Sequence, residues 1–309
     1  MKLVLYNDYT PGVLRDDTVI DISDAIRPLF SVTPQLTMEN LITSFEQYRG
    51  ALEKLQKDGK GVPLSSVRLR APLPKPSKII CMGGNNREFG QREIGDAWGF
   101  LKSPEAILDP DGVCVLPPHD ANIFHHEAEL VVVIGKKGKN IKPADAMDHV
   151  FGYTCGVDVS ARIDGAGGRG SMGKSFDTFA PIGPCIVTKD EIADPYNLRV
   201  RLWVDGELRP NYSTADLARG IRESLEWFTG YVTVNPGDIL FMGTNHQGLG
   251  AMQDGEKIDM EIEKIGRFSF TVSDPLKRRW HKGVDEATAR GVREGTGGPG
   301  AGIRPLAVS

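Results

Sequence analysis

Phe124–Gly135 reads FHHEAELVVVIG, and this stretch decides how the rest of the chain can fold. It is short, rich in β-branched residues and closed by glycine, which predicts a strand. Because side chains alternate between the two faces of a strand, Glu127 and Glu129 share one face, together with His125. Two carboxylates that lie close together repel each other unless a cation or a proton lies between them. The stretch therefore predicts a partner for these two charges.

A second apolar segment brings a third acid. Residues 151–160 read FGYTCGVDVS and carry Asp158 within another expected strand. Three carboxylates that converge from two strands would form an oxygen-rich site suited to Mg²⁺, Mn²⁺ or Ca²⁺. The spacing alone leaves a second interpretation open, in which Glu127 and Glu129 are solvated residues on the exposed face of an edge strand.

Four sequence blocks, in this order along the chain, resemble the fumarylacetoacetate hydrolase family. They are His126-x-x-Glu129-Leu130 with the valine run that follows, Gly152 to Arg162, Gly173 to Pro184, and Gly237 to Thr244. Together they span most of residues 75–272. The resemblance implies a rolled, mixed β-sheet around a central site. The many short strands and few helices that we expect from the sequence also favour a β-rich α+β domain.

The resemblance also implies which residues form the site. Glu127, Glu129 and Asp158 would together bind one divalent cation, Mg²⁺ or else Mn²⁺ or Ca²⁺. Lys174 would project into the same site, where its ammonium group can stabilise an enolate or a tetrahedral oxyanion. The alternative for Lys174 is a surface ion pair with Asp177, an arrangement that contributes little to stability.

Substrate contacts are expected from several segments that the blocks bring together. Thr244 would join Lys174 in stabilising the developing enolate. The other expected substrate-binding residues are Asn85, Lys102, Arg162 and Gln247. On this interpretation the substrate lies between the carboxylates and a set of polar and cationic side chains.

The sequence departs from the family where a base is expected. Family hydrolases typically carry a histidine on a lid after the first strand of the domain, and here Phe89 stands in its place. Activation of water would then need another group. His125 lies on the acid face but can instead support a carboxylate through a hydrogen bond. His246 is the better candidate, because its glycine-flanked loop corresponds to one that lines the substrate pocket. His246 could instead contact only a substrate carboxylate, or be exposed.

These features predict a divalent-metal-dependent hydrolase that cleaves a C–C bond in a 1,3-dicarbonyl or acylpyruvate-type substrate, through an enolate stabilised by the metal and Lys174. A second interpretation is decarboxylation or tautomerisation of a 2-oxo acid such as oxaloacetate, neither of which needs the lid histidine. A third, suggested by Phe89, is a catalytically silent, metal-stabilised dimer or scaffold. The intact acids and Lys174 favour an enzyme.

Composition argues against several other classes of protein. The net charge of −4 gives no basic patch for nucleic acid or an anionic membrane, and no apolar run is long enough to span a bilayer. The four cysteines lack a Cys-x-x-Cys pair and lie in or beside apolar runs, which predicts buried free thiols. With an N-terminus that turns polar too soon for a signal peptide, we expect a cytoplasmic homodimer that acts on a small keto acid or diketone.

We expect three parts along the chain. They are a small N-terminal domain over residues 1–72, a catalytic domain over 73–276 and a C-terminal tail over 277–309. The proline run from Pro72 to Pro76 indicates a semi-rigid linker between the first two parts. The polar, glycine-containing segment 83–98 is a candidate lid. The tail is basic and then rich in glycine, which is typical of a flexible segment or of one draped over a dimer partner.

Local signals predict a few elements directly. A hairpin is expected within residues 1–22, and a helix from about 38 to 57 with Thr37 as its N-cap. Asp205-Gly206 predicts a second hairpin, and residues 215–228 carry the apolar periodicity of a helix. No other helix is expected in the second half of the chain.

Gly168–Ser175 matches the phosphate-binding pattern G-x-x-x-x-G-K-[ST]. Such a loop works only between a preceding strand and a following helix, whose N-terminus and backbone N–H groups bind the phosphates. No strand fits residues 161–165, and Pro181 and Pro184 argue against a helix. The pattern therefore does not predict a nucleotide site.

Overall fold

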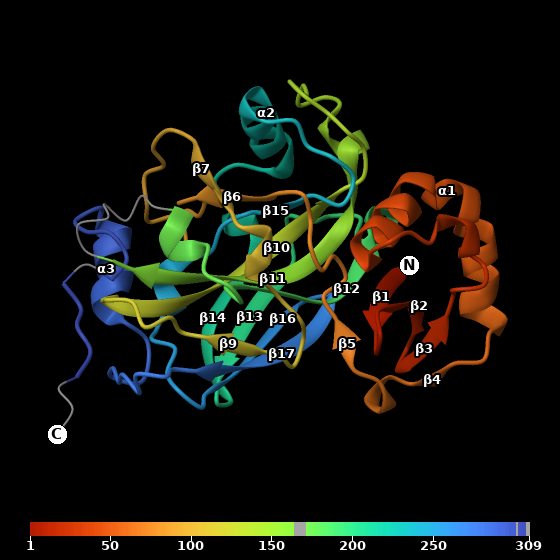
Figure 1. Ribbon diagram of the computed structural model, residues 1–309. Coiled ribbons are helices and arrows are strands. Elements are labelled where there is room, and N and C mark those ends of the chain that lie inside the picture. Colours follow the sequence, from red (N-terminus) through yellow and green to blue (C-terminus); the bar gives the residue numbers. More distant parts are fainter. Residues whose placement is uncertain (164–170, 301, 307–309) are drawn as a thin grey trace.

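Two β-sheets carry most of the fold, and three α-helices accompany them among the described residues (Figure 1). The computed structural model describes residues 1–163, 171–300 and 302–306. Short strands far outnumber helices, because most apolar runs are brief, β-branched and separated by turns. The structure confirms the predicted β-rich α+β class.

The larger sheet has twelve strands, and its main path runs β4-β3-β2-β1-β12-β11-β10-β15-β6-β7, while β5 pairs with β1 and β8 with β12. The bounds are β1 Lys2–Tyr6, β2 Thr10–Arg15, β3 Thr18–Asp21, β4 Val62–Pro63, β5 Leu69–Arg70, β6 Ile79–Gly83, β7 Trp98–Lys102, β8 Ile107–Leu108, β10 Ile123–Ile134, β11 Val150–Arg162, β12 Ala180–Thr188 and β15 Ile239–Phe241. Most pairs are antiparallel, but β15 pairs with β6 in parallel, so the sheet is mixed.

The smaller sheet has five strands in the order β14-β13-β16-β17-β9. The bounds are β9 Val113–Val115, β13 Arg199–Val204, β14 Glu207–Ser213, β16 Lys257–Ile262 and β17 Gly266–Ser273. The predicted turn at Asp205-Gly206 joins β13 to β14. Tyr212, on β14, donates a hydrogen bond of 2.7 Å to the Ala128 carbonyl of β10, so the smaller sheet is attached directly to the strand that carries the acids.

β10 lies at the centre of the larger sheet, between β11 and β15. Its twelve residues are all buried, Glu127 and Glu129 among them. The interpretation of these acids as solvated residues of an edge strand is therefore wrong. Both edges of β10 are paired, and the low exposure of Glu127 and Glu129 shows that the face from which they project is covered as well.

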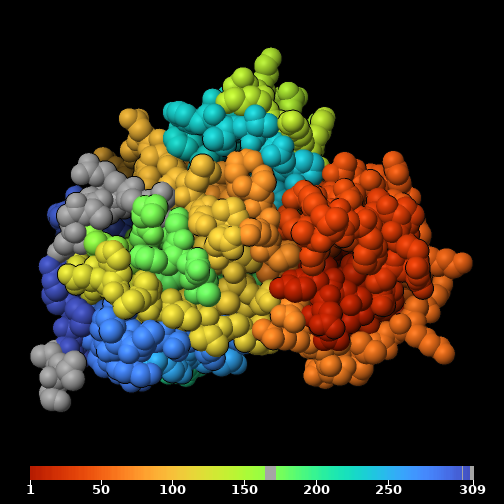
Figure 2. Space-filling model, in the orientation of Figure 1, coloured from red at the N-terminus to blue at the C-terminus, as the bar shows by residue number. Residues whose placement is uncertain are grey.

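The N-terminal strands continue the larger sheet through the antiparallel pair of β1 with β12. The predicted N-terminal hairpin is present as β1 and β2, and β3 extends it. Helix α1, Pro34–Asp58, packs beside these strands, and Figure 2 shows the N-terminal residues gathered at one end of this face. The site strands β10 and β11 lie between this end and the C-terminal helix (Figure 1).

Two helices differ from their predicted bounds. Helix α1 begins at Pro34 rather than near residue 38, and its N-cap is Thr33 rather than Thr37. The Thr33 hydroxyl accepts a hydrogen bond from Leu36 N at 3.2 Å, whereas Thr37 is buried inside the helix and donates to the Thr33 carbonyl. Proline is well suited to the first helical position, which explains the earlier start.

Helix α2 spans Ile221–Tyr231, because the residues before it form a short 3₁₀ turn, Thr214–Asp216. A third helix, α3 Glu286–Glu294, lies within the part of the chain that we expected to be a tail. Asp285 caps it by accepting a hydrogen bond from Thr288 N at 3.1 Å. The expectation of no further helix in the second half is therefore wrong.

The phosphate-loop pattern is followed by a strand rather than a helix. Gly168–Gly170 lie outside the described residues, while Ser171–Lys174 form a short 3₁₀ helix and β12 follows after a turn. The expectation that no α-helix follows the pattern is confirmed. All four cysteines are buried and free, as predicted. Within the described residues, no helix combines the length and apolarity needed to cross a membrane.

The revised start of α1 can be tested by substitution. Thr33→Ala should lower the free energy of unfolding by about 1 kcal/mol, because it removes the acceptor for a helical N–H group. Thr43→Ala, at an exposed position of the same helix, should change it by less than about 0.5 kcal/mol. Urea unfolding of both variants provides the measurement. An equal effect in the two variants would contradict the assignment of Thr33 as the cap.

Candidate active site

Three carboxylates meet in the middle of the larger sheet. The antiparallel register of β10 and β11 places Glu127 directly opposite Asp158, and Glu129 lies two residues further along the same face of β10. One carboxylate oxygen from each residue lies within 4.8 Å of the others, and all three residues are buried. The structure thus brings together the three acids that the sequence predicted would converge.

Three cations hold these acids. Lys174 contacts Glu127 and also lies 2.6 Å from Asp158 Oδ2. Arg162, at the end of β11, contacts the other oxygen of Glu127. Lys102, on β7, contacts Asp158 from a fully buried position and donates to the Phe179 carbonyl at 2.6 Å. Burying charges is costly unless they are paired and hydrogen-bonded, so these cations are what allow the acids to remain inside.

The two glutamates have opposite pKa shifts. Burial would raise the pKa of Glu127, but the charges of Lys174 and Arg162 outweigh it and hold that pKa well below its usual range. Burial, followed by repulsion from Asp158 and Glu127, raises the pKa of Glu129 well above its usual range. The described cations therefore leave Glu129 without full compensation, and its charged form is disfavoured unless a further cation is near.

The incomplete compensation of Glu129 indicates that a metal ion would fit among the three acids. Three buried carboxylates converge, and one of them is ionised only at the cost of strong repulsion. A divalent cation would remove that repulsion, and an all-oxygen donor set suits Mg²⁺, Mn²⁺ or Ca²⁺. One oxygen of Glu129 accepts a hydrogen bond from Gly243 N at 2.5 Å, which orients the carboxylate. Glu127, Glu129 and Asp158 are therefore suited to hold such an ion.

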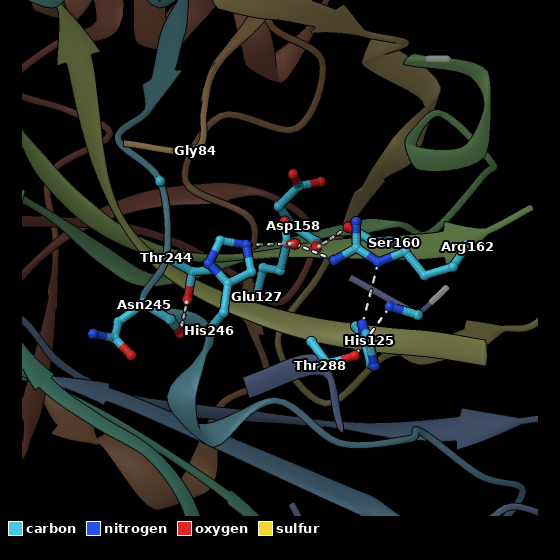
Figure 3. A network of polar contacts seen from close by, with 12 residues as sticks. Gly84, His125, Glu127, Asp158, Ser160, Arg162, Thr244, Asn245, His246 and Thr288 are labelled. Atoms are coloured by element: carbon cyan, nitrogen blue, oxygen red, sulfur yellow. Dashed lines mark hydrogen bonds and ion pairs between the residues drawn. The ribbon is translucent and has the colours of Figure 1, made fainter. Parts of the chain in front are cut away.

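His246 approaches the acids from the side opposite Arg162 (Figure 3). Its Nε2 lies 4.0 Å from Glu127 Oε1. Its Nδ1 lies 2.6 Å from Glu88 Oε1, and its backbone N–H donates to Glu88 Oε2 at 3.0 Å. Burial would raise the pKa of Glu88, but these hydrogen bonds lower it, so Glu88 is an ionised acceptor. Nδ1 must then carry the ring proton, and Nε2 faces the acids.

Glu88 comes from the segment that departs from the family pattern, one residue before Phe89. Phe89 itself is 54% exposed and does not line the cavity beside the acids. The segment is held in place by hydrogen bonds from Arg87 N and Phe89 N to Asp216. It thus supplies a carboxylate to the site, while the imidazole comes from the loop that carries His246.

The C-terminal helix α3 packs against this histidine loop. Gln247 Nε2 donates to Glu88 Oε2 at 2.7 Å and to the Ala289 carbonyl of α3 at 3.0 Å. Arg293, also on α3, donates to Gln247 Oε1 at 3.0 Å. Gln247, predicted to bind substrate, therefore joins the Glu88–His246 pair to the C-terminal helix.

His125 supports the site from a position next to the acids. Arg162 Nε donates to its Nδ1 at 3.2 Å, and its Nε2 lies 3.5 Å from Asp285 Oδ2, at the start of α3. Burial lowers the pKa of His125 to about 4, so the ring is neutral at physiological pH. Of the two roles that the sequence left open for His125, these contacts favour support of a neighbouring side chain.

The acids open onto a cavity of about 480 Å³. Its polar lining includes Glu127, Glu129, Lys174 and His246. One wall is aromatic, from Trp98 and Phe100 of β7. The C-terminal segment also contributes to the lining, with Val292, Gly295, Gly297, Gly298 and Pro299.

The predicted site residues fall into two groups. Those that line the cavity are Glu127, Glu129, Arg162, Lys174, Thr244 and His246. The other four are not part of the lining. Asp158 and Lys102 form the buried ion pair, Gln247 contacts Glu88, and Asn85 Nδ2 donates to the Arg219 and Met242 carbonyls. Asn85 thereby supports the loop whose Gly243 N–H donates to Glu129.

Sequence reasoning did not find Glu88, Arg92 or the C-terminal segment. Glu88 and Arg92 lie in an aperiodic stretch, where nothing indicates which side chains turn inward. The C-terminal segment has the composition of a flexible tail. A signal for α3 was present, since Asp285 followed by Thr288 and a run of helix formers is typical of a capped helix.

A family model described as fumarylacetoacetate (FAA) hydrolase C-terminal matches residues 78–273. The bovine mitochondrial oxaloacetate tautomerase FAHD2B is 39% identical over 219 residues, covering 66% of this chain and 69% of the relative. The maleylpyruvate hydrolase of Aquipseudomonas alcaligenes is 32% identical over 288 residues, covering 88% of this chain and 99% of the relative.

A solved structure of a similar enzyme also matches this chain over most of its length. The crystal structure of maleylpyruvate hydrolase from Sphingobium sp. SYK-6 in complex with manganese(II) and pyruvate superimposes with a TM-score of 0.80 at 33% identity, covering 89% of this chain and 99% of that one. The similar proteins named here are enzymes, a tautomerase and two hydrolases. The match over residues 78–273 includes every acid of the central site and both flanking residues, Lys174 and His246. The chain is a member of the fumarylacetoacetate hydrolase family.

Proposed function

We propose that this protein is a divalent-metal-dependent hydrolase that cleaves a C–C bond in an acylpyruvate-type 1,3-dicarbonyl acid. The observation that carries the proposal is the placement of His246 Nε2 and Lys174 Nζ around the same carboxylate, Glu127, at the wall of one cavity. A base and a cation so placed are the two groups that hydrolysis of a 1,3-dicarbonyl acid needs beyond the metal. Relatives named as maleylpyruvate hydrolases support this choice.

Glu127, Glu129 and Asp158 would hold the ion, Mg²⁺ or Mn²⁺, with Ca²⁺ as a third possibility. When bound, such an ion supplies Lewis acidity and a template for two oxygens of the substrate. The neighbour that contains manganese and pyruvate supports this assignment. Arg162 and Lys174 keep Glu127 ionised, and the Gly243 N–H orients Glu129, so both are ready to act as ligands.

His246 is proposed as the base. Glu88 holds the ring with its proton on Nδ1, so that Nε2 can accept a proton from water. The water oxygen then adds to the carbonyl carbon that is remote from the carboxylate. The bond from that carbon to the CH₂ carbon between the two carbonyls then breaks. The electron pair of the broken bond becomes the enolate of a 2-oxo acid, whose charge Lys174 and Thr244 stabilise until it is protonated.

A second candidate is tautomerisation or decarboxylation of an oxaloacetate-type acid. Bovine oxaloacetate tautomerase FAHD2B, at 39% identity, favours this alternative. Stabilisation of the enolate by Lys174 would suffice for either reaction, and His246 would then move a proton rather than activate water. A metal-supplemented assay of acetylpyruvate and oxaloacetate separates the reactions: release of pyruvate without CO₂ indicates hydrolysis, and release of CO₂ indicates decarboxylation. A change in the enol absorbance alone indicates tautomerisation.

Glu129→Gln tests the metal site. The substitution keeps the shape of the side chain but removes one negative charge, so Mg²⁺ or Mn²⁺ affinity should fall by at least about 10-fold. Because the pKa of Glu129 is raised, protons should compete with the ion in the wild type, and affinity should decrease as the pH is lowered. This dependence should weaken in the variant. Calorimetry provides the measurement, with the exposed Glu105→Gln as control.

Lys174→Met tests the proposed cation. Its charge matters most when negative charge develops on the substrate, so kcat should fall by about 100-fold or more while KM changes far less. The exposed Lys142→Met should leave both values unchanged. Steady-state kinetics on the substrate found in the assay measures this. Turnover at the wild-type rate in Lys174→Met would return this lysine to a purely structural role.

His246→Ala tests the proposed base. Loss of a general base typically lowers the rate by about 10²–10⁴, so kcat should fall by that order while metal binding is retained. The exposed His281→Ala serves as control. If His246→Ala weakens substrate binding but preserves kcat, the residue only recognises substrate, and the decarboxylase alternative gains support.

A further inference from the structure

Arg92 has a charge that the described site does not compensate. It lines the same cavity as Glu127 and Lys174. Its Nη1 donates to the Gly84 carbonyl at 3.2 Å, but no ion pair joins it to an acid in the part of the chain that the structure describes. The other two cations of the cavity wall, Arg162 and Lys174, both contact Glu127.

The surroundings of Arg92 favour an anion from outside the protein. The guanidinium lies beside Gly84, where a Cβ atom would come within 3.0 Å of Nη2, so glycine lets the group sit against the backbone. Trp98 lies next to the same glycine, and its ring and that of Phe100 form an apolar wall of the cavity. A guanidinium beside an apolar wall binds carboxylates well, because its planar fork of N–H groups matches their two oxygens.

The charges around the cavity also favour an anionic ligand. Lys102, Arg162 and Lys174 each contact Glu127 or Asp158, whereas Arg92, which lines the same cavity, contacts no acid among the described residues. A divalent cation held by the three central acids would add further positive charge to this side of the cavity. A ligand with two carboxylates would offset this charge, with one carboxylate near the central acids and the other at Arg92.

We propose that Arg92 binds a second carboxylate of the substrate, so that the protein selects dianionic 2-oxo acids over monoanionic ones. The 2-oxo-carboxylate end would lie at the three acids and the distal carboxylate at Arg92, with the chain between them along Trp98 and Phe100. The inference rests on the proposed function, because it assumes that a 2-oxo acid occupies this cavity. It adds the class of substrate and the residue that selects it.

The test compares two ligands that differ only at the far end. 2-Oxoglutarate and 2-oxopentanoate share a five-carbon 2-oxo acid chain, and only the first has a distal carboxylate. Neither is a 1,3-dicarbonyl acid, so binding is measured without C–C cleavage. Calorimetry on the Mn²⁺-loaded full-length protein should show tighter binding of 2-oxoglutarate, by about 10- to 100-fold, as expected for a hydrogen-bonded charged pair.

Arg92→Ala should remove this preference by weakening 2-oxoglutarate binding to the level of 2-oxopentanoate, while Mn²⁺ affinity stays unchanged. Arg92→Lys should keep part of it, because lysine retains the charge but not the fork of donors. Arg87→Ala is the matched control, since Arg87 lies on the same segment but donates to the Ala218 carbonyl and does not line the cavity. Thermal unfolding of each variant checks that the fold is intact.

Each outcome decides the matter. A preference for 2-oxoglutarate that is lost in Arg92→Ala and kept in Arg87→Ala supports the inference. Equal binding of the two acids by the wild type, or a preference that survives in Arg92→Ala, overturns it and leaves the proposed function standing. Failure of the Mn²⁺-loaded wild type to bind either acid overturns the inference and removes the support for the proposed function as well.

Discussion

The structure depends on one pairing, that of β10 with β11 in the middle of the larger sheet. The pairing places Glu127 opposite Asp158 and brings Glu129 onto the same face, with all three residues buried. Three carboxylates in such a place would destabilise the fold if nothing compensated them. Lys102, Lys174 and Arg162 provide much of that compensation, and each comes from a different part of the chain.

The cations of the site therefore have two effects: they stabilise the buried carboxylates, and some of them also present their charge to the cavity. Lys102 is fully buried and its contacts with Asp158 and the Phe179 carbonyl serve to hold one acid in place. Lys174 shares the same acid but borders the cavity, so its charge is available to a ligand. The incomplete compensation of Glu129 is what makes the site suited to a further cation. A fully balanced set of charges would have been more stable and chemically inert.

The same geometry is compatible with hydrolysis, decarboxylation and tautomerisation, because all three pass through an enolate. What separates them is the group that moves a proton, since a fold alone does not determine the reaction. Here residue 89 is not a histidine, and under the proposed function the proton is moved by His246, whose ring is held by the Glu88 carboxylate. The C-terminal helix reaches this pair through Gln247, so residues beyond the family match at 78–273 also shape the site.

The sequence by itself determined the strand character of Phe124–Gly135, the shared face of Glu127 and Glu129, the β-rich fold class and the family. These follow from local patterns, because a strand has a period of two whatever its position in a sheet. The assignment of the His246 loop to the substrate pocket came only from the resemblance to the family, not from a local pattern. Sequence reasoning misplaced the start of α1 by a few residues, since Thr33 and Thr37 carry the same capping chemistry.

Only the tertiary structure decided that β10 is central rather than an edge strand, because side-chain alternation is the same in both positions. It also decided which partners the charged groups find. Glu88 and His246 are separated by 158 positions along the chain, and their contact depends on how the lid segment docks against residues 216–219. The uncompensated charge of Arg92 and the attachment of α3 have the same origin. Local sequence sets the conformation of each segment, but packing between distant segments decides which polar groups meet inside the protein.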